Sequence, residues 1–355
     1  MGVTNRHAVR HVTYGRELEL KGLRQTIQIQ ASGSSQVIVG EYGVGKSHLC
    51  EMLSFYLEEQ GYAVARLELG ASHSRAEYPR YILEAIENNL RVHIDGHLYS
   101  GLSDLVLLRR AIDSFQARLW DRRDVLSAHE HAPGRQNLSA RVGQLRQTLM
   151  LHPNYNPHWM SLASEVPFEL TATNRAVAQL NHLAHLLKVV GVPGVVVIFD
   201  EAERSETLPR GSYRVERARD VIVGFALASS NKDTSSLKHF RNESIRSHPY
   251  LPSGLALFHT VFAFTYPWGL SVQLERLLGI TALRLSPFKK NAHDSLFEKI
   301  INLYEQAYDY APHMTNEDVR RLKRDNDDSD VRSVVRTMVA GLDYFRYREE
   351  DGDRH

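Results

Sequence analysis

The sequence predicts an α/β fold in which a parallel sheet of five strands is flanked by helices on both faces. Short apolar runs of strand length alternate with stretches of helical periodicity, the pattern of a parallel sheet connected through helices. The five runs are 37–39, 63–69, 194–200, 257–264 and 281–285. A glycine-rich loop follows the first run, and a pair of acidic residues follows the third. If the glycine-rich loop binds phosphate, it needs an acidic residue on a neighbouring strand. The loop and the acidic pair therefore support one another.

The composition limits the classes of protein to consider. The 355 residues are enough for a large core and about two domains. With 43 basic and 42 acidic residues the net charge is +1, so any contact with DNA would need a local basic patch. Cys50 is the only cysteine, which excludes an internal disulfide and a cysteine-rich metal site. Without an apolar run near the roughly 18 residues of a membrane span, or a signal-peptide pattern, we expect a cytoplasmic protein with no membrane contact.

The loop from Gly40 to Ser47 carries the strongest chemical signal. Its sequence, GEYGVGKS, fits the phosphate-loop pattern G-x-x-x-x-G-K-[ST] between a predicted strand and a predicted helix. Glycines let the backbone N–H groups turn toward a phosphate, and the helix start adds its positive end. Lys46 is expected to reach the β- and γ-phosphates of ATP, and the Ser47 hydroxyl to bind Mg²⁺. The alternative is a chance glycine turn that carries a lysine.

The predicted nucleotide contacts share this loop and the start of the helix after it. They are Gly40, Glu41, Tyr42, Gly43, Val44, Gly45, Lys46, Ser47 and His48. The predicted cofactors are therefore ATP and Mg²⁺.

The run that ends at Asp200 predicts the acidic half of the same site. Residues 194–203 read GVVVIFDEAE, an apolar strand followed by two acids, which is the Walker B pattern. Asp200 is expected to order Mg²⁺, and Glu201 to polarise the attacking water as a general base, with Glu203 as its rival. The alternative is a buried strand that runs into an acidic helix start.

Residues 71–190 are expected to form a long, mainly helical insert. Two segments in it, 81–90 and 105–120, have helical periodicity. Histidine pairs at 129/131 and 182/185 have no carboxylate or cysteine at zinc-ligand spacing, so ordinary histidines are the preferred interpretation. A basic stretch follows at 204–248, with acids interleaved. It is open to two interpretations, a solvated surface or a contact with the DNA backbone.

The C-terminal part is expected to be a helical lid. From residue 287 the helical segments are 292–308, 316–323 and 331–344. We therefore divide the chain into a nucleotide-binding core, residues 1–286, and a lid, residues 287–355.

The order of these motifs resembles the AAA+ ATPases of BREX phage-defence systems, of the BrxC/BrxD type and closest to BrxD in length. The blocks that carry the resemblance are GEYGVGKSHL, VVVIFDEAERSETL, the strand that ends at Thr265, and LERLLGITALRLSPF. It covers residues 12 to 345 approximately. The resemblance implies a P-loop NTPase of AAA+ type with strand order 5-1-4-3-2, a C-terminal helical lid, and partners among other defence-system proteins.

The resemblance also implies roles for residues outside the two motifs. Thr265 takes the sensor-1 position, and Arg332 takes sensor 2, with Arg336 as its rival. Arg276 is similar to the arginine finger that one AAA+ subunit supplies to the next, which implies a homo-oligomer, either a ring or a dimer. Each of these residues is also open to a plainer interpretation, as a strand-end hydroxyl, a helix-surface arginine or, for Arg276, an ion pair with Glu275.

The turn at Gly15 and Arg16 resembles the entry segment of origin-initiator and STAND AAA+ ATPases, which packs beside the adenine. The plainer interpretation of its charged neighbours is a solvated face of the helix that contains Leu23 and Ile27.

Three functions follow from these features. The first is an ATP-hydrolysing motor or switch in a defence system, with DNA as a candidate partner. The second is an adaptor that binds ATP without hydrolysing it, and the third is a DNA replication or transposition initiator of AAA+ type. Asp200 and Glu201 together favour hydrolysis. An initiator with an appended winged helix is disfavoured, because only residues 346–355 follow the lid helix.

Overall fold

A computed structural model gives the fold of most of the core and lid. It describes residues 15–30, 32–69, 78–94, 96–101, 104, 176–177, 180–181, 183–184, 187–188, 191–206, 213–234, 237, 256–266, 269–287, 290–310, 317–318 and 331–352. The expected helices at 105–120 and 316–323, both histidine pairs and most of the loop at 229–247 lie outside the described residues, apart from 317–318, which are helical.

A seven-stranded sheet forms the centre of the core, in the order β4-β3-β2-β5-β6-β1-β7. Its strands are β1 (Ser35–Gly40), β2 (Ala63–Glu68), β3 (Arg91–Ile94), β4 (His97–Ser100), β5 (Val195–Asp200), β6 (Phe258–Thr265) and β7 (Leu283–Leu285). Strands β2, β5, β6, β1 and β7 run parallel. These are the five predicted strands, and their order is the one that the resemblance implies.

The two further strands correct the prediction of a five-stranded sheet, and they lie within the insert at 71–190 that was expected to be mainly helical. Strands β3 and β4 form an antiparallel hairpin, in which Val92 pairs with Tyr99 and Ile94 with His97. Gly96 in the turn has a φ of 79°, a conformation that glycine adopts without strain. The sequence did contain a signal for this turn, because Asp-Gly between two short apolar runs is typical of a hairpin.

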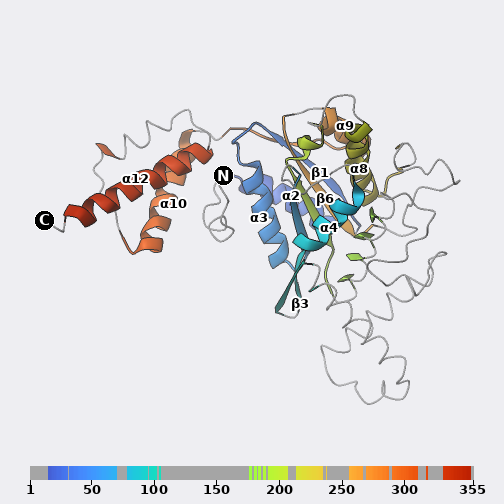
Figure 1. Cartoon of the computed structure of the whole chain (residues 1–355), viewed down its shortest axis with the longest axis horizontal. Helices are drawn as coiled ribbons and strands as arrows, with labels where there is room; N and C mark the ends of the chain where they lie inside the picture. The colour runs from blue at the N-terminus through green and yellow to red at the C-terminus, as the bar shows by residue number, and fades with distance from the viewer. Residues whose placement is uncertain are drawn as a thin grey trace, which may run out of the picture.

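Helices cover both faces of the sheet (Figure 1). On one face lie α2 (Glu17–Ile29) and α3 (Lys46–Glu59), whose apolar side chains share a core with Ile38, Val196 and Val261. On the other lie α4 (Pro79–Asn89), α8 (Tyr213–Ser229) and α9 (Gly269–Leu278). A short 3-10 helix, η2 (Ala202–Glu206), follows β5. The sheet is thus buried on both faces, which explains why its strands are continuously apolar.

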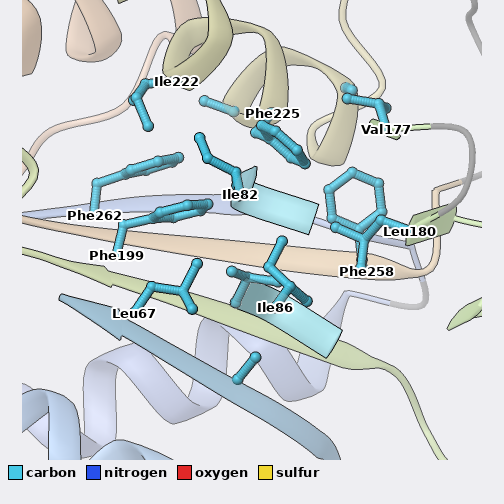
Figure 2. Close-up of a cluster of buried hydrophobic side chains, with 14 of the residues drawn as sticks. Leu67, Ile82, Ile86, Val177, Leu180, Phe199, Ile222, Phe225, Phe258 and Phe262 are labelled. Atoms are coloured by element: carbon cyan, nitrogen blue, oxygen red, sulfur yellow. The ribbon is translucent and has the colours of Figure 1, made fainter. Parts of the chain in front are cut away.

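Aromatic side chains fill much of the second face (Figure 2). The rings of Phe199 on β5 and Phe262 on β6 are stacked, with centroids 4.8 Å apart and planes 5° from parallel. Phe225 of α8 packs against Phe199 at 6.1 Å. Helix α8 lies inside the basic stretch at 204–248, where no helix was expected. Its second half is buried from Val221 to Ser229, because it is apolar on every side.

The C-terminal helices form a core of their own. Helices α10 (Lys290–Tyr308) and α12 (Val331–Gly352) pack together through Phe297, Ile300 and Met338, beside the sheet domain in Figure 1. The Tyr304 hydroxyl donates a 2.6 Å hydrogen bond to Asp343 across this pair. The last helix is longer than predicted, and the domain boundary at residue 286 stays a prediction. Within the described part of the chain, no helix combines the length and the apolar character that crossing a membrane requires.

Candidate active site

The parallel register brings the motif residues to one edge of the sheet. Gly40 ends β1 between its two neighbours, opposite Thr265 of β6 and Leu285 of β7. Asp200 ends β5 opposite Glu68 of β2. In open α/β sheets, ligands bind in the crevice at the carboxyl ends of the strands. The predicted phosphate loop, Asp200 and Thr265 therefore lie where their strands end, at the same edge of the sheet.

The loop from Gly40 to Gly45 needs its glycines. Gly43 and Gly45 have φ values of 81° and 94°, in the left-handed region. A Cβ on Gly40 would lie 2.8 Å from Cγ2 of Val44 and 3.1 Å from Cβ of Leu285, too close for any side chain. Gly45 caps α3, so Lys46 and Ser47 stand in its first turn. The predicted strand–loop–helix unit is confirmed, and its amides start a helix whose N-terminal end favours anions.

Lys46 is buried at the base of this loop. Its ammonium donates to the carbonyl oxygens of Gly40 and Glu41, at 3.0 and 2.8 Å. Burial lowers the pKa of Lys46, and the negative charges of Glu203 and Asp200 oppose that shift. The lysine and the acids that follow β5 therefore lie close enough to interact, although more than 150 residues separate them in the chain.

Asp200 is almost fully buried, and both of its carboxylate oxygens accept hydrogen bonds. Oδ1 accepts from the backbone N–H of Glu201 at 3.0 Å, and Oδ2 accepts from Nη2 of Arg66 at 2.7 Å. Arg66, on β2, was not among the predicted site residues. The available signal was an arginine in the middle of an otherwise apolar strand, AVARLEL.

Glu201 and Glu203 occupy different surroundings. Glu201 has a left-handed backbone, φ 54°, and its carboxylate forms a 2.8 Å ion pair with Nε of Arg204. Burial raises the pKa of Glu201, and Arg204 opposes the shift. Glu203, two residues further on in η2, acts on Lys46 more strongly than Glu201 does. Both acids lie near the loop, so the assignment of the general base stays open between them.

Arg16 ties the N-terminal segment to the loop. It is buried, and its Nη2 donates to the carbonyl oxygens of Val44 and Ser286, at 2.8 and 2.6 Å. Its Nη1 forms an ion pair with Glu19. Gly15 is exposed beside it, with φ 72°. The entry segment therefore lies against the phosphate loop, while its contact with adenine stays a prediction.

The remaining predicted residues of the loop and of the start of α3 differ in their exposure to solvent. Glu41 and Tyr42 are exposed at its tip, and Ser47 is half-buried. His48 is also half-buried, and burial lowers its pKa to about 4. The charge of Lys299 on α10 contributes to that shift, so the lid approaches the start of α3.

The three arginines predicted from the resemblance lie on α9 and α12. Arg276 is exposed in the last turn of α9, and its neighbour Glu275 pairs with Arg284 at 3.3 Å instead. Arg332 belongs to α12, but its side chain lies outside the described residues. Arg336, its rival, is exposed on the same helix. Arg276 and Arg336 are therefore both open to solvent in the described part of the chain, and their roles stay predictions.

The basic stretch at 204–248 is only partly described. Arg204 pairs with Glu201, Arg217 lies over the ring of Tyr78 at 5.4 Å, and Arg219 donates to Gln273. The lysines and arginines from 238 onward lie outside the described residues. Among the residues that the structure does place, no group of three His, Cys, Asp or Glu side chains could hold a metal ion by itself.

A family model described as an AAA ATPase domain matches residues 12–212, more than half of the chain. The chain belongs to this family. Its sheet order and strand–loop–helix unit are those of an AAA+ P-loop NTPase. No curated protein matches the sequence.

One solved structure with a similar fold is that of the Aeropyrum pernix ORC1 protein in complex with DNA. The two chains are 14% identical, with a TM-score of 0.44. The match covers 96% of this AAA ATPase chain and 63% of that chain, so this chain spans less than two thirds of its length.

The residues of this AAA domain fit a nucleotide with Mg²⁺. The loop offers the start of α3 and a buried ammonium to phosphate oxygens, in place of the two carbonyl groups that Lys46 now contacts. The Ser47 hydroxyl and the Asp200 carboxylate are oxygen ligands of the kind that Mg²⁺ prefers. These donors meet the requirements of a triphosphate site.

Replacing Lys46 tests the nucleotide site. Lys46→Ala removes the cation expected at the β- and γ-phosphates, so we expect ATP affinity to fall by at least about tenfold. Titration with a fluorescent ATP analogue measures the change, with Lys21→Ala, an exposed position on α2, as the control. Unchanged ATP affinity in Lys46→Ala would contradict the assignment of the loop.

Proposed function

We propose that this chain binds ATP with Mg²⁺ and hydrolyses it to ADP and phosphate, acting as a nucleotide-driven switch or motor. The observation that carries the proposal is the buried ammonium of Lys46 under the phosphate loop, with Asp200, Glu201 and Glu203 close enough to act on its charge. A site that only bound nucleotide would not need a second acid beside the metal-binding one. Membership in the AAA ATPase family supports the proposal.

Each residue has a distinct part in the proposed reaction. Lys46 and the loop amides hold the β- and γ-phosphates, and Ser47 and Asp200 hold the metal. Mg²⁺, when bound, neutralises charge on the phosphate oxygens. Glu201 or Glu203 accepts a proton from the attacking water. Thr265 pairs with Gly40 in the sheet, and we assign to it the sensor-1 role of orienting groups near the γ-phosphate.

The proposal includes a second subunit. Arg276 is exposed, and the neighbouring Glu275 pairs with Arg284, which is consistent with an arginine that acts on a second subunit. A guanidinium delivered to the γ-phosphoryl group is worth about 10³–10⁵ in rate in phosphate-loop enzymes. We therefore propose a homo-oligomer, with Arg332 or Arg336 of the lid as sensor 2.

The finer assignment, to a BREX-type phage-defence system in the cytoplasm, is supported by the motif blocks of the sequence alone. Genes for a methyltransferase and an alkaline-phosphatase-like protein beside this one would support it, whereas an isolated replication locus would favour the initiator alternative. DNA stays a candidate partner through the basic stretch at 204–248. If that stretch binds DNA, affinity must fall steeply with salt.

A pair of isosteric variants identifies the general base. Glu201→Gln should bind Mg²⁺ and ATP but hydrolyse roughly 10²–10⁴-fold more slowly, since a positioned base contributes about that much. Single-turnover phosphate release measures the rate, and Glu203→Gln is the matched comparison from the next turn. Normal hydrolysis by Glu201→Gln together with slow hydrolysis by Glu203→Gln would transfer the role to Glu203.

Mixing two inactive variants tests the arginine in trans. Arg276→Ala should bind ATP normally and hydrolyse it at least about 10²-fold more slowly, in line with the worth of an arginine finger. Adding Lys46→Ala should restore part of the activity, because a mixed interface joins an intact pocket to an intact Arg276. Turnover that is independent of protein concentration and unaffected by Arg276→Ala would rule out the role.

A further inference from the structure

Arg66 links the metal-binding acid to the helix that begins at the phosphate loop. From the middle of β2, its Nη1 forms a 2.5 Å ion pair with Glu51 of α3, and its Nη2 forms a 2.7 Å ion pair with Asp200. The side chains of Glu51 and Asp200 are 10% and 2% exposed. The guanidinium thus compensates two buried carboxylates at once, with the two-pronged geometry that only arginine has.

The role proposed for Asp200 conflicts with this contact. Its Oδ1 accepts from the N–H of Glu201 and its Oδ2 accepts from Arg66, so a metal ion, or the water bound to it, would share this carboxylate with the guanidinium. A cation beside a carboxylate repels a divalent ion at the same carboxylate, and it does so more strongly where the surroundings are buried. Metal binding must therefore weaken the contact with Arg66 or proceed against it.

We propose that Arg66 is a latch that competes with Mg²⁺ for Asp200 and thereby sets the metal affinity of the site. The inference rests on the proposed function, since it assumes that Asp200 binds the metal. Without metal, the guanidinium keeps Asp200 paired and the empty site stable. When Mg²⁺ binds with the nucleotide, the guanidinium leaves Asp200 and keeps its ion pair with Glu51. This movement of Arg66 also changes how β2 contacts α3.

The structure gives the guanidinium room for this exchange. Arg66 and Glu51 line a cavity of about 510 Å³ together with Ser54, Asn88 and Arg91. The cavity lies where β2 and β3 diverge, because their only ladder pair is Val64 with Arg91. Polar side chains on the far wall can accept hydrogen bonds from a guanidinium that has left Asp200.

The test measures metal affinity directly, with Mn²⁺ as the probe. In the presence of saturating ADP, free Mn²⁺ is counted by its paramagnetic resonance signal for the wild-type protein and for Arg66→Met. We expect the variant to bind Mn²⁺ about tenfold more tightly, because the competing cation is gone. Arg91→Met is the matched control, since Arg91 lines the same cavity but pairs with Glu58, and its Mn²⁺ affinity should stay within about twofold.

A second variant changes the affinity in the opposite direction and covers the case in which Arg66→Met does not fold. Glu51→Gln removes the partner that retains Arg66 when it leaves Asp200, so Mn²⁺ should bind about three- to tenfold more weakly. Glu58→Gln, on the same helix and paired with Arg91, serves as its control. Unchanged Mn²⁺ affinity in Glu51→Gln would overturn the latch, as would equal or weaker affinity in Arg66→Met.

ADP binding in EDTA separates this inference from the proposed function. If wild-type protein and variants bind ADP alike without metal, the Mn²⁺ titrations decide the latch alone. If the wild-type protein binds no ADP either in EDTA or with Mn²⁺, the proposed function fails and the latch fails with it. Melting temperatures add an independent readout, because Arg66→Met removes an ion pair from each of two buried carboxylates. The metal-free variant should melt lower than the wild type and should gain more from Mn²⁺ and ADP together.

Discussion

The site depends above all on the parallel register of β1 with its neighbours. Because β1 lies between β6 and β7, Gly40 ends opposite both Thr265 and Leu285, and the loop begins where its neighbours stop. A shift of one residue would turn every side chain to the opposite face of the sheet. That shift is costly here, since both faces are buried. The stacked rings of Phe199 and Phe262 fix the neighbouring pair of strands in the same way.

The charges at this edge are compensated before any nucleotide arrives. Lys46 contacts two loop carbonyl groups, Asp200 contacts Arg66, and Glu201 pairs with Arg204. Buried charges are stable only when they are paired or hydrogen-bonded. If the proposed function holds, nucleotide and metal take the place of these partners, and binding is an exchange of contacts. Such an exchange links occupancy of the site to β2, α3 and η2, which gives a physical basis for a nucleotide-driven switch.

Short sequence motifs predicted the centre of the candidate site. Contacts between residues far apart in the chain could not be predicted in this way. The phosphate loop and Asp200 were predictable because each sits in a short pattern that phosphate and Mg²⁺ require. Arg66 was not, since its partners lie 15 and 134 residues away. The β3–β4 hairpin was missed because strands of four residues show little periodicity. Helix α8 was not predicted because its first half is rich in arginine and its second half is apolar on every side, so neither half shows an amphipathic pattern. The side chain of Arg332 and most of the insert beyond residue 104 lie outside the described residues, and the contact of Arg276 with a second subunit is a proposal.

The most direct test of the account is the Mg²⁺-dependent release of phosphate from ATP by the wild-type protein and by Asp200→Asn. The substitution keeps the shape of the side chain and removes the charge that the account assigns to the metal. We predict measurable turnover by the wild type, a loss of roughly 10²-fold or more in the variant, and retained ADP binding in EDTA. Equal turnover by the two proteins would contradict the account, because the acid at the end of β5 would then have no part in the reaction.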